Sequence, residues 1–416
     1  MSLSGVNPDI DDTPVPAQPE PSGAGGRWSI PQPPRLSLPT GGMLIYAGIR
    51  VLSAAIAAFL LGHGKYRLYG WSLVHWMRSS DGGHYAAIAA HGYTYPAGQL
   101  AHASVFSWFP GYPAVIDAIA WLPGVTIVAA GLVVTAVAGL AAAWGLTALG
   151  MKLTGDPRIS LLMVAIWAVA PSSTVLSMVY AEALFCALAI WALVALVSRR
   201  WLTAAGLTLA AGTVRSTALA LILAICAAAL IAVIQAVRAR QPFAQWWRAL
   251  WWRPLAAVLL APLGLLGFLG YVALATHRLD GWFWAEKHVM HMTFDWGTST
   301  LRVVKGTVLG TPSVAAVLVV AAITASALLM LWSLTERIPV YLHVYTIVVV
   351  VMALTTSANW ISSKPRFMLP AVLLALPLAR LLAPLRTSVL VPLIGVLAVA
   401  TTWFGVYLPV IARWTP

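Results

Sequence analysis

Long apolar runs separated by short polar connections dominate the chain after residue 42. A helix needs about 20 apolar residues to cross hydrocarbon, so each long run predicts a membrane-spanning helix. We predict about eleven spans, near residues 43–62, 125–149, 159–175, 181–197, 202–214, 217–236, 254–275, 313–334, 339–356, 367–384 and 388–411. This pattern predicts an all-α fold, a polytopic transmembrane helical bundle.

Two kinds of segment depart from this pattern. Residues 1–42 are rich in proline, glycine and serine and lack apolar periodicity, which predicts a disordered tail before one transmembrane domain, 43–416. Within that domain, the connections 63–124 and 276–312 are long. Their aromatic stretches, FSWFPGYPAVIDAIAWLP and DGWFWAEKHVMHM, predict re-entrant or surface-lying helices that roof a cavity.

Charged residues divide between the two sides of the predicted membrane domain. The short connections are basic and contain Lys152, Arg158, Arg199, Arg200, residues 238–253, Arg337 and Arg386. The positive-inside rule therefore places these connections and the N-terminal tail in the cytoplasm. Most acidic residues after the tail fall on the opposite side, namely Asp81, Asp117, Glu182, Asp280, Glu286 and Asp295. We expect a plasma membrane protein whose carboxylate chemistry takes place on the outer face.

Composition supports the membrane assignment. The chain has 416 residues, 60% hydrophobic and 9% charged, whereas soluble domains carry about 25% charged residues. The net charge of +13 raises the question of nucleic acid, but the basic residues lie as pairs and singles between apolar runs. We therefore expect contacts with membrane lipids and no nucleic-acid partner. Cys186 and Cys226 fall inside apolar runs, so we expect core residues rather than a disulfide or metal site.

The segment 76–96, WMRSSDGGHYAAIAAHGYTYP, contains the strongest candidate for chemistry. Asp81 is followed by Gly82 and Gly83, so a substrate could approach its carboxylate without side-chain obstruction. The alternative is that Asp81 only caps a helix that starts near Gly82. Residue types alone leave both interpretations open.

This segment resembles the first luminal loop of the PIG-V-like mannosyltransferases, members of the GT-C superfamily. Where that family carries a tryptophan before the loop aspartate, this chain has Ser80. The matching positions are Asp81, His84, Tyr85, Ile88, Ala89, Gly92 and Tyr93. Further segments resemble the family in the same order over 43–384: WFPGYP at 108–113, VYAEALF around Glu182, TVRSTAL around Arg215 and KPRFMLP around Arg366.

The resemblance implies an inverting transfer of a sugar, mannose in that family, from a polyprenyl-phosphate donor to a lipid or glycan acceptor. Asp81 is the candidate general base, and His84 and Tyr85 are expected to bind substrate beside it. Arg215 and Arg366 are expected to bind the donor phosphate through their forked guanidinium groups, although each could instead snorkel to a lipid headgroup. Because the lipid-linked sugar is a substrate, no cofactor or metal is expected.

Four further residues are candidate substrate contacts. Glu182 opens a predicted helix, where the helix dipole favours an anion, and it also lies in a family-like segment. Lys287, His288 and His291 form a second polar cluster, in which the two histidines could share a helix face. A metal site there would need more ligands than the sequence places nearby.

Other functional classes remain as alternatives. A glycosidase pairs two carboxylates across the scissile bond, and Glu182 or Asp280 could partner Asp81. A transporter or lipid flippase is also all-helical, but it typically shows internal repeats and charges deep in its spans. The sequence shows no clear repeat, and its charges cluster toward one face, which favours the enzyme. A non-catalytic assembly subunit stays open.

Overall fold

A computed structural model describes residues 37–93, 105–238 and 252–415 of the chain. Within these ranges the secondary structure is helical and contains no β-strand, which confirms the predicted all-α fold. The first helix, α1 (Leu38–Gly62), begins a few residues before the predicted span. Residues 1–36 of the predicted tail lie outside the described residues.

Six helices are long and apolar enough to cross a membrane. They are α1, α6 (Ile127–Thr154), α10 (Ala218–Arg238), the pair α12 (Trp252–Leu260) and α13 (Leu263–Thr276), α16 (Val314–Ser333), and α20 (Thr387–Tyr407) with the turn that follows it. Each matches a predicted span within a few residues. The predicted span 367–384 is instead a broken pair, Ile361–Phe367 and Val372–Leu382, bent by 81°. Pro370 lies in that break, where it cannot donate a helical hydrogen bond.

The predicted count of about eleven spans is not confirmed, because four apolar runs form shorter helices. These are α7 (Pro157–Ala168), α8 (Glu182–Val197), α9 (Trp201–Gly212) and α17 (Val340–Thr355). A helix the length of α7 rises about 18 Å, whereas the hydrocarbon core is about 30 Å thick. Most side chains of α8 are buried against the neighbouring helices. A helix buried within the protein needs the same apolar residues as one exposed to lipid, so composition does not distinguish the two.

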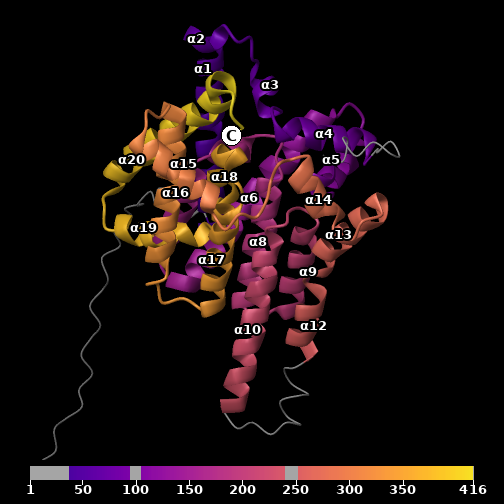
Figure 1. Cartoon of the computed structure of the whole chain (residues 1–416). Helices are drawn as coiled ribbons and strands as arrows, with labels where there is room; N and C mark the ends of the chain where they lie inside the picture. The colour runs from indigo at the N-terminus through magenta and orange to yellow at the C-terminus, as the bar shows by residue number, and fades with distance from the viewer. Residues whose placement is uncertain (1–36, 94–104, 239–251, 416) are drawn as a thin grey trace, which may run out of the picture. The chain divides into compact units, whose positions relative to one another are not determined.

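Both long connections fold into short helices. Residues 63–124 contain α2 (Gly64–Arg67), α3 (Leu73–Met77), α4 (Asp81–His91) and α5 (Gly111–Ala120). Residues 276–312 contain α14 (Gly281–His288) and α15 (Thr298–Leu309). In Figure 1, α3, α4, α5 and α14 gather at one end of the bundle, far from the C-terminal end of α10. The aromatic stretches are therefore helical, as predicted, and they assemble one end of the fold.

Close helix contacts and satisfied polar groups hold this arrangement. Trp76 of α3 is fully buried, and its Nε1 donates to the carbonyl of Gly405 in α20 at 3.1 Å. A Cβ on Gly139 of α6 would lie 2.1 Å from the Tyr46 hydroxyl, so α1 and α6 pack there only because the residue is glycine. Arg50 of α1 donates through its two terminal nitrogens to the carbonyls of Ser173 and Ala168, which partly satisfies a half-buried cation inside the bundle.

Candidate active site

The segment that ends at Asp81 packs directly on the segment that ends at Glu182. The amide of Val179 donates to the carbonyl of Met77 at 2.9 Å, and the Tyr180 hydroxyl donates to the carbonyl of Ser79 at 3.2 Å. A Cβ on Gly82 would lie 3.1 Å from the Val179 carbonyl oxygen, so a side chain there would push the two segments apart. Two family-like motifs about a hundred residues apart thus become neighbours.

The motif WFPGYP packs in the same way against the turn that carries Arg215. The Gly111 amide donates to the Thr213 carbonyl at 2.7 Å. A Cβ on Gly111 would come within 2.6 Å of the Thr213 hydroxyl oxygen. This close approach fixes the start of α5 beside the turn before α10, and so positions Arg215.

Arg366 is presented by a short helix, α18 (Lys364–Phe367), that Lys364 ties to the end of α17. The buried Lys364 Nζ donates to the carbonyls of Ala353 at 2.8 Å and Thr356 at 2.6 Å. These bonds satisfy the lysine and the otherwise unpaired carbonyls at the helix terminus. All five family-like motifs therefore converge at one place.

A chain of four charges forms where the motifs meet. The Arg366 Nη2 lies 2.9 Å from Asp81 Oδ2, and its Nε lies 3.3 Å from Glu182 Oε1. The same Glu182 oxygen accepts from Arg215 Nη1 at 2.6 Å. Two carboxylates thus balance two guanidinium groups, which lowers the cost of holding charge inside a helical bundle.

The four side chains of this charge chain differ in their exposure to solvent. The side chain of Glu182 is 1% exposed and that of Arg366 5%, whereas Arg215 is 15% and Asp81 21% exposed. Glu182 therefore lies behind the two arginines and holds them, while Asp81 is the accessible end. The capping alternative for Asp81 is not seen, since Ser80 occupies the N-cap position of α4. Ser80 has φ 56°, a conformation that non-glycine residues seldom adopt and that marks a strained turn presenting Asp81.

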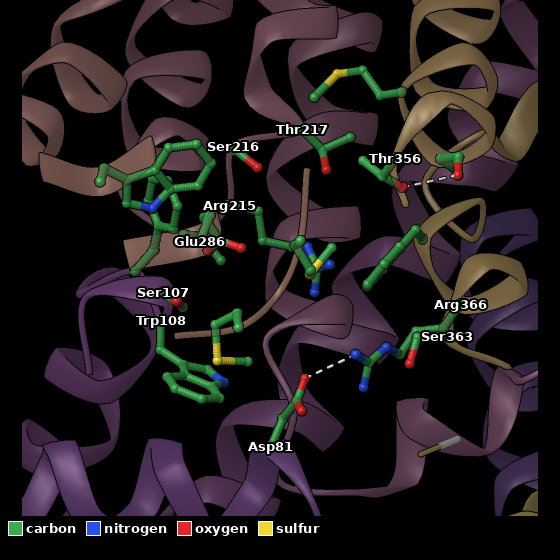
Figure 2. Close-up of a pocket in the computed structure, with 18 of the residues that line it drawn as sticks. Asp81, Ser107, Trp108, Arg215, Ser216, Thr217, Glu286, Thr356, Ser363 and Arg366 are labelled. Atoms are coloured by element: carbon green, nitrogen blue, oxygen red, sulfur yellow. Dashed lines mark hydrogen bonds and ion pairs between the residues drawn. The ribbon is translucent and has the colours of Figure 1, made fainter. Parts of the chain in front are cut away.

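Asp81, Arg215 and Arg366 line a cavity of about 690 Å³. Figure 2 shows the Asp81–Arg366 pair on one side of this cavity, with Glu286, Ser107 and Trp108 across from Arg366. Apolar side chains of membrane helices complete the wall: Leu219 of α10, Leu265 and Leu269 of α13, and Val349 and Met352 of α17. The cavity wall therefore combines charged and apolar side chains.

His84 and Tyr85 of α4 also line the cavity, as the motif predicted. The His84 ring stacks on Trp108 with centroids 4.0 Å apart. Tyr85 meets Tyr112 edge-on at 5.1 Å and is buried, and this burial raises the pKa of its phenol well above the usual value. Tyr85 therefore stays protonated and can donate a hydrogen bond into the cavity. Glu182 does not reach the cavity wall, so its predicted role as a substrate contact becomes one of holding Arg215 and Arg366.

The predicted cluster of Lys287, His288 and His291 does not form. Helix α14 ends at His288, and His291 follows it in an exposed position with φ 52°, so the two histidines share no helix face. His288 Nδ1 instead contacts the carbonyl of Trp284 at 3.0 Å. Of the three residues only Lys287 lines the cavity. The described part of the chain holds no group of three or more potential metal ligands.

Glu286 is a candidate functional residue to which the sequence pattern assigned no role. It lies on α14, lines the cavity and is partly buried. Burial, together with the charge of Asp81, raises the pKa of Glu286 to about 7, although the Ser107 hydroxyl lowers it. Among the residues with defined positions, no cation forms an ion pair with it. The available signal was an acidic residue two positions after the aromatic run of residues 282–284 and directly before Lys287.

The fold and the site together define a multi-pass membrane enzyme, in which a paired carboxylate and two arginines face a partly apolar cavity. The family model for Mannosyltransferase (PIG-V) matches residues 55–301, more than half of the chain, and the chain belongs to this family. It is therefore a mannosyltransferase. The matched range contains Asp81, Glu182 and Arg215, and the fold adds Arg366 from outside it. No curated protein matches the chain.

Proposed function

We propose that this mannosyltransferase moves mannose from a polyprenyl-phosphate donor to a lipid or glycan acceptor, with inversion, on the non-cytoplasmic face of the plasma membrane. The observation that carries the proposal is the wall of the cavity, which combines Asp81, Arg215 and Arg366 with apolar side chains from three helices. A lipid-linked sugar phosphate has the same two-part character. GT-C-like membrane enzymes, which the loop motifs resemble, use donors of this type.

In the proposed reaction an acceptor hydroxyl oxygen attacks the anomeric carbon as the bond from that carbon to the phosphate oxygen breaks. The hydroxyl proton passes to Asp81, and the phosphate leaves with both bonding electrons as polyprenyl phosphate. No strong acid is needed, because the leaving group is a stable anion. A positioned general base of this kind contributes about 10²–10⁴-fold in rate.

The arginines would stabilise the charge that develops on the phosphate. Guanidinium groups bind phosphate oxygens in a bidentate fork, and such charge-assisted bonds are stronger than neutral ones. Within the part of the chain that the structure describes, Arg366 Nη1 has no hydrogen-bond partner, so this guanidinium retains an unused donor beside its bond to Asp81. Donor phosphate would compete with Asp81 for Arg366 and thereby leave Asp81 free to accept a proton.

The apolar part of the wall suits the prenyl chain of the donor. The apolar lining residues come from three helices: Leu219, Leu265, Leu269, Val349 and Met352. Burial of each methylene group contributes about 0.8 kcal/mol, so a few isoprene units would hold the donor in the membrane domain. The phosphate would then lie toward the arginines.

Transfer of label tests this proposal. Membranes containing the protein are incubated with radiolabelled polyprenyl-phosphate mannose, and the labelled product is identified. We expect label to leave the donor and appear in a single lipid or glycan product that is missing from membranes without the protein. Label that remains entirely on the donor would overturn the proposed donor.

Arg366 provides a prediction about donor use. Arg366→Ala should raise the donor KM about ten- to hundredfold. This factor corresponds to the free energy of one to two charge-assisted hydrogen bonds. Arg366→Lys should have a smaller effect, because it loses the fork but keeps the charge. Donor kinetics of purified variants measure this, with Arg380→Ala as the control, since Arg380 is 44% exposed and pairs with Glu336 away from the cavity. Wild-type donor kinetics in both Arg366 variants would leave Arg366 as a structural residue.

Cysteine accessibility tests the proposed orientation. Lys305 of α15 and Arg200 before α9 are both exposed, and the predicted topology places them on opposite sides of the membrane. In a chain whose two native cysteines are replaced by alanine, Lys305→Cys should react with an impermeant maleimide in intact cells. Arg200→Cys should react only after permeabilisation. The reverse pattern would place the cavity on the cytoplasmic side.

A further inference from the structure

Glu286 faces the cavity from the side opposite Arg366 (Figure 2). Asp81, the other carboxylate in the cavity wall, forms an ion pair with Arg366. The four side chains of the charge chain, Asp81, Arg366, Glu182 and Arg215, together carry no net charge. No cation among the described residues forms an ion pair with Glu286. It therefore needs hydrogen-bond donors from whatever occupies this end of the cavity.

Two neighbouring groups indicate which donors those are. Trp282 lines the cavity one helical turn before Glu286, and its buried Nε1 has no hydrogen-bond partner in the described ranges. Ser107 lines the wall close enough for its hydroxyl to affect the ionisation of Glu286. This corner of the cavity thus combines a carboxylate acceptor, an indole donor and a hydroxyl that can do either. A ligand hydroxyl satisfies all three, because it donates to the carboxylate and accepts from the indole.

Flat aromatic surfaces flank the same corner. Trp108 is stacked on His84, and Trp282 packs against Phe109 with centroids 6.1 Å apart. Amphipathic rings of this kind offer apolar faces to the C–H surface of a sugar while leaving polar edges for hydrogen bonds. A phosphate group does not fit the corner, because the carboxylate of Glu286, which has no ion-pair partner among the described residues, would repel it.

We propose that Glu286, Trp282 and Ser107 form the acceptor subsite, and that the acceptor presents a neutral polyhydroxyl group, a sugar or a cyclitol, rather than a phosphorylated headgroup. This inference rests on the proposed function, since it divides one cavity into a donor end at the arginines and an acceptor end at α14. The acceptor hydroxyl that reacts would be held between Glu286 and Asp81. Glu286 then contacts the acceptor directly and orients it.

Equilibrium binding to the protein in nanodiscs without glycolipid tests the subsite separately from sugar transfer. The probes are radiolabelled octyl α-mannoside, its 6-phosphate, and polyprenyl phosphate. Glu286→Gln should weaken octyl mannoside binding about ten- to hundredfold, as expected for a hydrogen bond to a charged group, and leave polyprenyl phosphate binding unchanged. The matched control is Asp280→Asn, because Asp280 is an exposed carboxylate that flanks the same helix and pairs with Arg278.

The pH dependence of binding supplies a second readout. The charged groups around Glu286 in the cavity wall are Asp81 and His84 of α4, Arg215, Arg366, and Lys287 of its own helix. Since the pKa of Glu286 is raised to about 7, its carboxylate form is lost as the pH falls through 7. Mannoside affinity should therefore fall about tenfold from pH 8 to pH 6. The glutamine variant cannot titrate and should show no such fall, which separates Glu286 from His84.

The outcomes distinguish the subsite from the proposed reaction. Equal mannoside affinity in wild type and Glu286→Gln, or tighter binding of the 6-phosphate than of the mannoside, would overturn the subsite. Absence of saturable mannoside binding to the wild-type protein would overturn it as well. Mannoside binding that depends on Glu286, in a protein that transfers no label from polyprenyl-phosphate mannose, would support the subsite and remove the proposed donor.

Discussion

Asp81→Asn is expected to lower the rate of mannosyl transfer by roughly two to four orders of magnitude while the protein still folds and binds donor. Asparagine has nearly the same size as aspartate and keeps a hydrogen bond to Arg366, but it cannot accept the proton of the acceptor hydroxyl. A residue that acts only in the chemical step lowers kcat and leaves the donor KM nearly unchanged. Single-turnover transfer by purified protein measures this effect.

The control for Asp81 is a carboxylate outside the cavity wall. Asp117 lies exposed on α5 and does not line the cavity, so Asp117→Asn should transfer at the wild-type rate. Thermal stability of Asp117→Asn should stay close to wild type. Asp81→Asn should lose less stability than Glu182→Gln, because Asp81 is 21% exposed and Arg366 keeps Glu182 as a partner. Retention of more than about a tenth of wild-type turnover by Asp81→Asn would remove it as the base. Glu286, the other carboxylate of the cavity wall, would then be the base to test.

Glu182→Gln is expected to cause the largest loss of stability, about 3–5 kcal/mol in the free energy of unfolding. Glu182 is 1% exposed and pairs with both Arg215 and Arg366, so a neutral side chain leaves buried positive charge without its partner. The free energy can be measured by steric trapping in bicelles. Transfer should also fall, because both arginines lose the carboxylate that positions them.

A second carboxylate–arginine pair provides the comparison. The side chains of Glu336 and Arg380 are 9% and 44% exposed. Because Arg380 can reach solvent once its partner is neutral, Glu336→Gln should cost only about 1 kcal/mol. The double variant Glu182→Gln, Arg215→Gln should be destabilised by less than the sum of the two single variants, because it restores part of the charge balance. A Glu182→Gln loss no larger than that of Glu336→Gln would show that the charge chain is not structurally important.

The sequence predicted the membrane helices best where the apolar run was long. The runs that became α1, α6, α10, α16 and α20 each exceed the length needed to cross hydrocarbon. Shorter runs such as Glu182–Val197 were read as spans because lipid and protein interior select the same residues. Only the packing of α8 against its neighbours shows that it is buried within the bundle.

For the site, the sequence predicted the members but not their pairing. Asp81, Arg215 and Arg366 were identified as candidates, yet the contact between Asp81 and Arg366 joins residues far apart in the chain and depends on the bend at α18. His288 and His291 could have shared a helix face, but α14 ends at His288. Glu286 received no role, since its position in the cavity wall follows from how α14 packs against Phe106 and Phe109.

The most direct test follows the fate of the sugar with purified protein in nanodiscs. The donor is labelled polyprenyl-phosphate mannose of known anomeric configuration, and the acceptor is a lipid extract of the native membrane. We expect one polyprenyl phosphate released for each mannosyl group transferred, with the opposite anomeric configuration in the product by NMR. Free mannose as the only labelled product, or a product with the donor's configuration, would contradict an inverting transfer that uses Asp81 as the base.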